Sequence, residues 1–355
     1  MSVRRRLALA SLVLCSSLAL PALAREAPPS PETTRRPRVG LALAGGGARG
    51  GALVGVLKVM DELRIPVDYV AGTSIGSIVG GLHAIGMPPE RMAEELRTID
   101  WEDALSDDPA RPERRFRKKE DDARYLINVE LGLSKGKLVV PSGLVAGQKL
   151  GYHIRRLTWP ASSVTDFDRL PIPYRCVAAD IETGEAVVLG SGDLARALRA
   201  SMAIPGFFSA VEWEGRLLVD GGVARNLPVD VVRKMGAEVV IAVDISTPLM
   251  KRDDIKGFLG VLNQTSGFLT RLNVEQQIGT LRGRDVLVAP DLEGIPTLGF
   301  PQFGEAIERG VAAGRAAAQR LRELSVSEAE YAAWKAARPP LFTDEVPEIA
   351  ELRVE

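Results

Sequence analysis

Two strand–glycine–helix units follow one another within residues 38–85, and they constrain the fold more than any other feature of the chain. The first begins "RVGLALAGGGARGGALVGVLKVMDEL" and the second "VDYVAGTSIGSIVGGLHA". Because a short crossover separates the two apolar runs, we expect two neighbouring parallel strands. Farther along, the runs "AEVVIAVDIS" and "DVLVAP" continue the alternation of strands and helices. The pattern predicts an α/β fold with a mostly parallel central sheet and helices on both faces.

The glycine loop of the first unit fits more than one kind of site. Gly45, Gly47 and Gly50 satisfy the pattern G-x-G-x-x-G, and Asp68 stands about twenty residues farther on, as in a dinucleotide-binding fingerprint. Amides at such a turn can equally form an oxyanion hole, because they stabilise a developing negative charge. Close packing of strand against helix is a third explanation. The motif by itself leaves all three open.

The turn of the second unit contains a serine, in the sequence Gly72-Thr73-Ser74-Ile75-Gly76. A tight strand-to-helix turn with a serine near the helix cap is one explanation. A nucleophile elbow is the other, because flanking glycines permit a strained turn that presents the hydroxyl to a cleft. Both glycine loops are expected at the carboxyl ends of neighbouring strands, where open α/β sheets build their sites. A nucleophile beside a set of amides indicates acyl transfer.

The two histidines of the chain do not suit a catalytic triad. His83 follows Ser74 by nine residues in the same predicted helix, which is about 13 Å along the axis. His153 lies in "GQKLGYHIRRLTW", a predicted surface helix. Both precede any acid in the second half of the chain, unlike the hydrolase order of serine, acid and histidine. We therefore expect both histidines to be structural.

A carboxylate can replace histidine as the base if it lies within hydrogen-bond reach of the hydroxyl in a partly desolvated cleft. Asp220 is the best candidate, because it ends the apolar run "RLLV" and is followed by Gly221 and Gly222, which permit a sharp turn. An aspartate that caps a turn is the simpler explanation. Asp180 and Asp244 also end strand-like runs, but neither is followed by two glycines.

The N-terminus has the three parts of a secretory signal peptide. Arg4, Arg5 and Arg6 precede the apolar run "LALASLVLCSSLALPALA", which ends in an A-x-A site at Ala22-Leu23-Ala24. We expect export, with the protein periplasmic, associated with the outer membrane or secreted. A buried N-terminal helix or a membrane anchor is the alternative, but the run is short for a span. Residues 25–37 are Pro-rich and polar, and they predict a disordered lead.

Composition argues against several classes of function. The 355-residue chain has a formal net charge of −1, which gives no indication of a nucleic-acid partner. Two histidines and one cysteine outside the predicted signal, Cys176, argue against a zinc site. With Cys15 inside the predicted signal, an intramolecular disulfide in the mature chain is excluded. We expect neither a metal nor a cofactor.

Three motifs taken together, "GGGARG", "GTSIG" and "DGG", resemble those of the patatin-like phospholipase family in kind and order. The segment "SMAIPGFFSAV" is similar to the family's S-x-A-x-P segment, and the resemblance covers about residues 38–325. It implies a three-layer patatin-like fold, a modified α/β hydrolase with a Ser–Asp dyad and no catalytic histidine. D-G-G replaces the commoner D-G-A here, and both occur in the family.

Carried over by position, the resemblance implies that Ser74 is the nucleophile and Asp220 the proton acceptor in carboxyl-ester hydrolysis of glycerophospholipids, a phospholipase A type activity. Arg49 would steady the glycine loop or meet a lipid phosphate. A phospholipid and a membrane surface are the implied partners. A non-catalytic patatin-like module that binds lipid is the alternative. The residues assigned to the oxyanion hole are Gly45, Gly46, Gly47, Ala48, Arg49 and Gly50.

Two further segments bear on lipid access and on domain organisation. In residues 253–277, six apolar side chains fall near one helical face, which predicts a core-facing amphipathic helix, with a lid or membrane-docking helix as the alternative. These six are Ile255, Phe258, Leu259, Leu262, Leu269 and Leu272. "IPTLGF" (residues 295–300) is expected to help line an acyl channel. Residues 326–355 resemble the junction to a POTRA domain in patatin-type autotransporters, so either the chain is a fragment or this tail packs onto the domain.

Overall fold

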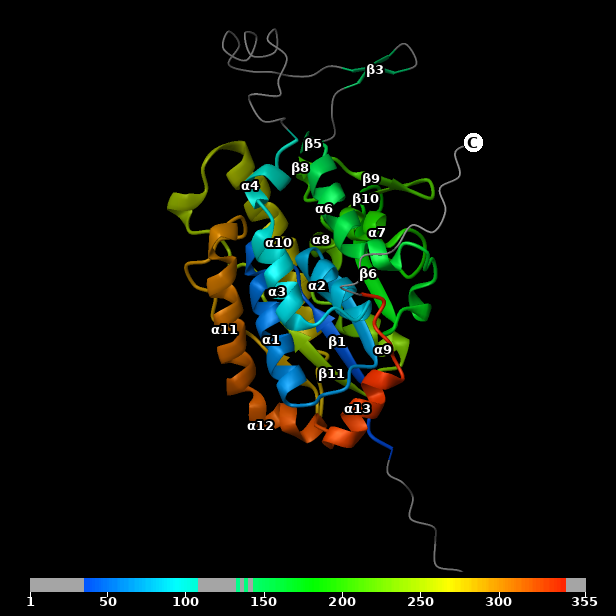
Figure 1. Cartoon of the computed structure of the whole chain (residues 1–355). Coiled ribbons are helices and arrows are strands. Elements are labelled where there is room, and N and C mark those ends of the chain that lie inside the picture. Colours follow the sequence, from blue (N-terminus) through cyan, green and yellow to red (C-terminus); the bar gives the residue numbers. More distant parts are fainter. Residues whose placement is uncertain (1–34, 108–131, 135–136, 140–142, 343–355) are drawn as a thin grey trace, which may run out of the picture. The chain divides into compact units, whose positions relative to one another are not determined.

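A computed structural model describes residues 35–107, 132–134, 137–139 and 143–342 (Figure 1). The predicted signal peptide (residues 1–24) and nearly all of the predicted lead (residues 25–37) lie outside these residues, and both stay predictions. The last part of the tail, residues 343–355, lies outside them as well.

The centre of the described chain is a mixed sheet of eight strands. In sheet order these are β12 (Val286–Val288), β11 (Val239–Val243), β1 (Val39–Leu43), β2 (Tyr69–Thr73), β6 (Tyr174–Asp180), β10 (Arg216–Asp220) and β9 (Val211–Trp213), with β7 (Ala186–Leu189) paired to β6. The pairings from β12 through β11, β1 and β2 to β6 are parallel. Those of β6 with β10 and β7, and of β10 with β9, are antiparallel. The predicted parallel neighbours β1 and β2 are confirmed.

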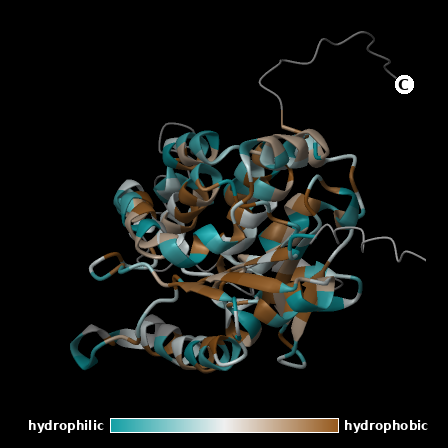
Figure 2. Cartoon of the chain, turned by 90° about the horizontal axis from the view of Figure 1, so that it is seen from below, coloured by the Kyte–Doolittle hydropathy of each residue, from teal (hydrophilic) through white to brown (hydrophobic). Residues whose placement is uncertain are grey.

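Helices cover both faces of this sheet, and Figure 2 shows the hydrophobic sheet between the two helical layers. A Cβ on Gly80 of α2 (Ile75–Ala84) would contact Val70 and Leu43, whereas a Cβ on Gly40 would meet Val232 of α9 (Val229–Met235). Because side chains alternate along a strand, Leu43 and Gly40 point to opposite faces, and so α2 and α9 lie on opposite sides. The strand β11, VVIAV, is buried throughout, as a strand covered on both faces should be.

The remaining elements fall into groups that pack together. On the α2 side are α1 (Gly51–Glu62), α3 (Pro89–Thr98), α7 (Leu194–Ser201) and α11 (Phe303–Ala316); with α9 pack α8 (Gly222–Arg225) and α10 (Gly257–Ile278). Shorter or peripheral elements are α4 (Trp101–Ala104), α6 (Gln148–Thr158), α12 (Ala318–Leu321), α13 (Glu328–Ala336), the pair β3 (Gly132–Ser134) and β4 (Lys137–Val139), and the pair β5 (Gly143–Val145) and β8 (Gly206–Phe208).

The predicted core-facing helix in residues 253–277 is corrected by the structure. Leu269 and Leu272, on the face expected to be buried, are 49% and 59% exposed. Leu262, on the same helix, lines an internal cavity instead. The helix carries apolar side chains on two sides, so periodicity identified a helix but not which side is covered. The side chains of Phe258 and Leu259 lie outside the described part of the chain.

The tail beyond residue 325 packs onto the domain as far as it is described. Ser327 forms a capping box with Glu330 at the start of α13. The Tyr331 hydroxyl lies 2.7 Å from an Asp61 carboxylate oxygen, and the Val326 amide donates to the Arg64 carbonyl. Residues 326–342 thus pack onto the domain, and the predicted POTRA-like junction at the end of the tail lies outside the described residues and stays a prediction.

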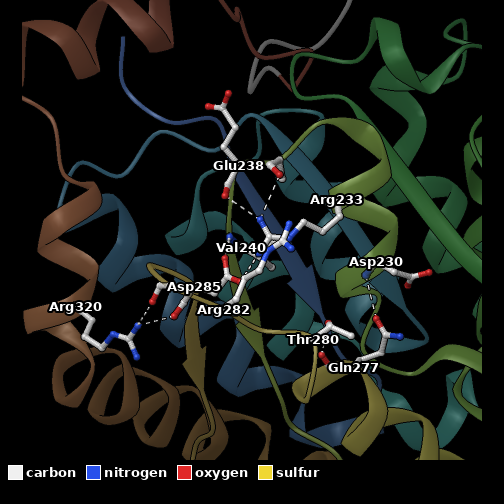
Figure 3. A network of polar contacts seen from close by, with 11 residues as sticks. Asp230, Arg233, Glu238, Val240, Gln277, Thr280, Arg282, Asp285 and Arg320 are labelled. Carbon is white, nitrogen blue, oxygen red and sulfur yellow. Dashed lines mark hydrogen bonds and ion pairs between the residues drawn. The ribbon is translucent and has the colours of Figure 1, made fainter. Parts of the chain in front are cut away.

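A buried carboxylate, that of Asp285, connects strands and helices at the amino-terminal ends of β11 and β12, as Figure 3 shows. Asp285 accepts hydrogen bonds from the amides of Val240 and Arg282 at 2.8 and 2.7 Å, and it forms an ion pair with Arg233. The Arg320 side chain donates to the Asp285 carbonyl. The Asp285 side chain is only 2% exposed, so the two amides and Arg233 depend on its carboxylate as their buried acceptor.

Replacing Asp285 by alanine is expected to lower the free energy of unfolding by about 3–5 kcal/mol, because it leaves Arg233 and two amides without their buried acceptor. Urea unfolding of the variant measures this. The matched control is Glu275→Ala, which breaks the exposed Arg271–Glu275 pair on α10 and should cost less than about 1 kcal/mol. Equal losses for the two variants would contradict a structural role for the buried pair.

Candidate active site

The register of the sheet brings Ser74 and Asp220 together. On one edge of β6, Val177 pairs with Thr73 of β2, and the next residue, Ala178, pairs with Asp220 of β10. The other edge of β6 is occupied by β7 at both positions. Strands β2 and β10 therefore share one edge of β6 and run toward each other along it. Their carboxyl ends meet, and Ser74, which follows Thr73, lies opposite Asp220.

The two side chains are in direct contact. The Ser74 hydroxyl lies 2.6 Å from Asp220 Oδ2, and the other carboxylate oxygen accepts the Gly222 amide at 2.8 Å. Both residues are buried, with 6% and 7% of their surface exposed. Burial raises the pKa of Asp220 to about 6, although the hydrogen bonds from Ser74 and Gly222 act in the opposite direction. A base with such a pKa is ionised at neutral pH and still takes up a proton readily.

Ser74 has the strained backbone of a nucleophile elbow. Its φ and ψ are 55° and −128°, a combination that costs a non-glycine residue of order 1–3 kcal/mol and is kept where the surroundings enforce it. The Ser74 amide donates to Ser201 Oγ, which itself donates to the Val177 carbonyl. The turn also needs Gly72, because a Cβ there would lie 2.2 Å from the Gly76 carbonyl oxygen.

The glycine loop reaches the serine from the neighbouring strand β1. A Cβ on Gly45 would stand 2.8 Å from the Ser74 Cβ, so only glycine allows this approach. The Gly45 amide donates to Asn226 Oδ1 at 3.1 Å and the Ala48 amide to the Thr297 carbonyl at 2.8 Å. These two amides already donate to acceptors within the protein and are not free to bind an oxyanion. The predicted oxyanion hole is therefore corrected by leaving Gly45 and Ala48 out of it. In the described chain the amides of Gly46 and Gly47 have no such partner, and both residues line the cavity.

Arg49 has a structural task in this loop. Its guanidinium donates to the Ser246 carbonyl at 2.6 Å, and only 5% of the residue is exposed. Burial lowers the pKa of Arg49, and the nearby charges of Asp244 and Asp291 counteract that shift. Of the two predicted roles, steadying the loop agrees with these contacts.

A cavity of about 440 Å³ opens beside the dyad, large enough for a small ligand or part of a lipid chain. Its lining is mainly apolar and comes from the loop after β11, from α10 and from the segment around Pro205. The "IPTLGF" segment contributes Thr297 and Leu298 to this lining, and its part in an acyl channel stays a prediction. Apolar lining residues are Ile204, Pro205, Phe207, Val223, Pro248, Leu249, Met250, Leu262 and Leu298.

Sequence reasoning missed two asparagines that connect the parts of the site. Asn226 bonds through its side chain to both polar groups of Gly45 and to Ser246 Oγ. Asn273 of α10 accepts the Asn226 amide and donates to the Gly222 carbonyl. In the sequence they look like ordinary polar residues of a turn and a helix, and only their long-range partners reveal them.

The other candidate residues lie outside the cavity. His83 is half-buried near the charges of Asp61 and Lys335, and desolvation of its ring lowers its pKa to about 4. His153 is half-buried on α6. The carboxylates of Asp180 and Asp244 each cap a local turn, accepting the amides of residues 182 and 246. No group of three or more His, Cys, Asp or Glu side chains within the described ranges is arranged to hold a metal ion.

Comparison with known proteins agrees with the motif resemblance. The family model "Patatin-like phospholipase" matches residues 41–233. The chain is 34% identical over 307 residues to the patatin-like phospholipase domain-containing protein ZK370.4 of Caenorhabditis elegans, covering 80% of this chain and 21% of that protein. It is 28% identical over 323 residues to the lysophospholipase NTE1 of Kluyveromyces lactis, covering 80% and 19%. The chain thus spans about a fifth of the length of these curated relatives.

The crystal structure of VipD from Legionella pneumophila aligns with a TM-score of 0.39 at 14% identity, covering 81% of this chain and 67% of VipD.

Proposed function

This chain belongs to the patatin-like phospholipase family, and from that premise we propose that it is a lipid acyl hydrolase acting through Ser74 and Asp220. The observation that carries the proposal is the 2.6 Å contact between the Ser74 hydroxyl and a buried carboxylate of raised pKa, at the end of an apolar cavity. The glycine loop packed against that serine supplies amides, and a dinucleotide site offers no reason for such a dyad.

The proposed reaction has two steps that share one base. Asp220 takes the proton of the Ser74 hydroxyl while the Ser74 oxygen attacks the acyl carbonyl carbon. The tetrahedral oxyanion that forms accepts hydrogen bonds from the Gly46 and Gly47 amides. Asp220 then gives the proton to the departing alcohol oxygen, which leaves an acyl ester on Ser74. A water molecule attacks this ester while Asp220 takes its proton. The second tetrahedral intermediate then collapses and releases the fatty acid. Asp220 returns its proton to the Ser74 oxygen, which restores the serine hydroxyl.

The substrates that fit this site are carboxyl esters of glycerophospholipids, including lysophospholipids. The apolar lining of the cavity suits an acyl chain, and the relatives named lysophospholipases share most of this chain's length with it. The type of ester cleavage is that of a phospholipase A. We further propose export through residues 1–24, on the strength of the three-part N-terminal pattern.

Fatty-acid release from phosphatidylcholine and lysophosphatidylcholine tests the activity, beside labelling with a fluorophosphonate, from which an activated serine oxygen displaces fluoride. We expect release from at least one lipid and one adduct, located at Ser74 by peptide mass. Inert protein on both lipids and on a short-chain ester, with Ser74 unlabelled, would contradict the proposal.

The pH dependence of the reaction provides an independent check. Since Asp220 acts only when ionised and its pKa is raised to about 6, kcat/KM for a soluble short-chain ester should be constant above about pH 7. Below about pH 6 it should fall roughly tenfold per pH unit, as a single group takes up its proton. A pH–rate profile from pH 4.5 to 8 measures this. A rate that stays constant down to pH 5 would mean that Asp220 is not the base.

A further inference from the structure

Helix α10 (Gly257–Ile278; Figure 1) lines the cavity with several residues and also carries exposed apolar side chains. On its inner side Leu262 lines the cavity and Val274 is buried. On its outer side Val261, Phe268, Leu269 and Leu272 are between 47% and 59% exposed. Four large apolar side chains exposed on one helix are more than single scattered surface residues, and they are suited to contact with a partner surface.

The four exposed residues form one stripe, which we call the outer stripe: Val261, Phe268, Leu269 and Leu272. Their spacing of seven, eight and eleven residues from Val261 places them on one face of a helix. Between Gly257 and Leu272 the only charged residue is Arg271. Large apolar side chains gathered on one exposed helix face, here with Thr265 between them, are typical of an interaction site.

Helix α10 contributes to the cavity as well as to the surface. Its residues Leu262, Gly267 and Thr270 line the cavity, and Leu298, which also lines it, is 55% exposed. A partner that covers the outer stripe therefore lies on a helix that borders the cavity beside Ser74. This arrangement suits a partner that also supplies the substrate.

The charges of the segment just before α10 favour an anionic partner surface. Lys251, Arg252 and Lys256 are exposed and outnumber their acidic neighbours Asp253 and Asp254. Basic side chains beside an apolar helix face are typical of helices that lie in the plane of a membrane interface. No described helix is long and apolar enough to cross a membrane.

From these observations we infer that the outer stripe of α10 docks on the surface of a phospholipid bilayer and places the cavity mouth against it. The inference rests on the proposed function only for the choice of lipid as the occupant. The inner side of the same helix is bonded to the acid turn, since Thr270 and Asn273 both donate to the Gly222 carbonyl. The helix that would contact the bilayer therefore also forms hydrogen bonds to Gly222, two residues after Asp220.

Vesicle sedimentation tests the docking surface separately from catalysis when it is done in a Ser74→Ala background. The probe is vesicles of phosphatidylcholine with phosphatidylglycerol. The double variant Phe268→Gln and Leu272→Gln should bind at least roughly tenfold more weakly, because two apolar side chains no longer leave water. The matched control is Ile181→Gln with Leu217→Gln, which removes two exposed aliphatic side chains next to each other elsewhere and should bind as the parent does.

Binding that is unchanged in the α10 variant, or reduced equally in the control, overturns the inference. So does a parent chain that is dimeric in solution and becomes monomeric in the α10 variant, because the outer stripe would then be covered by a second copy. Selective loss of vesicle binding supports docking even if the wild type releases no fatty acid. That last result would contradict the proposed function alone, so the two proposals fail separately.

Discussion

Replacing Ser74 by alanine is expected to reduce kcat/KM for ester hydrolysis by at least about 10⁴-fold, because the variant retains no nucleophile at the only point where the dyad, the glycine loop and the cavity meet. Stability should change little, since alanine keeps the Cβ that the strained backbone already accommodates. Single-turnover kinetics on a short-chain ester measure the loss, and thermal unfolding checks the fold.

Ser77→Ala is the matched control for this prediction. Ser77 is also buried at the start of α2, and its hydroxyl donates to the Ser74 carbonyl without touching Asp220. Its removal should cost no more than about tenfold in kcat/KM, through small changes in the elbow. Retention of activity within tenfold in Ser74→Ala, or equal losses in both variants, would place the nucleophile elsewhere.

Much of the fold follows from local sequence patterns. The strands on either side of the first crossover and the helices after each glycine turn lie where apolar runs and turn residues predict them, as with Tyr69–Thr73 followed by Ile75–Ala84. The helical segment after Gln302 is divided in the structure, with α11 ending at Ala316 and α12 beginning at Ala318. Parallel pairing of β1 with β2 follows from the length of the crossover.

What the sequence could not predict is how distant strands meet. Asp220 was identified by its two following glycines, but its contact with Ser74 depends on β10 entering antiparallel and sharing an edge of β6 with β2. That register is a property of the whole sheet. The roles of Asn226 and Asn273 could not be predicted either, because their hydrogen-bond partners lie 181 and 51 residues away in the sequence. The side of α10 that faces solvent is likewise decided by what packs against it.

Replacing Asp220 by asparagine is expected to have two opposite effects. Activity should fall by about 10³–10⁴-fold, because the amide cannot accept the Ser74 proton. Stability should rise by about 2 kcal/mol at pH 8, because the buried charge is removed while an oxygen remains to accept the Gly222 amide. Hydrolysis assays and thermal unfolding on the same preparation measure both effects.

The pH dependence of this gain identifies its cause. The Asp220 pKa rises from 3.8 to about 6 on folding, so the folded state loses stability relative to the unfolded state as the pH rises through this interval. Below about pH 3 the carboxyl is protonated in both states, and Asp220→Asn should gain nothing there. Above pH 6 the full gain should appear, as an increase of a few degrees in Tm.

Asp180→Asn completes the comparison, because Asp180 is equally buried at the end of a neighbouring strand but bonds to the Glu182 amide and not to Ser74. It should keep ester hydrolysis within about twofold, since its carboxylate is not part of the reaction, and its Tm at pH 8 shows what the removal of an equally buried carboxylate does elsewhere in the sheet. If Asp220→Asn gained stability at pH 3 as well as at pH 8, relief of packing strain would explain it. A gain confined to high pH, together with lost activity, would mean that the chain maintains an unfavourable buried charge at the position where the reaction needs a base.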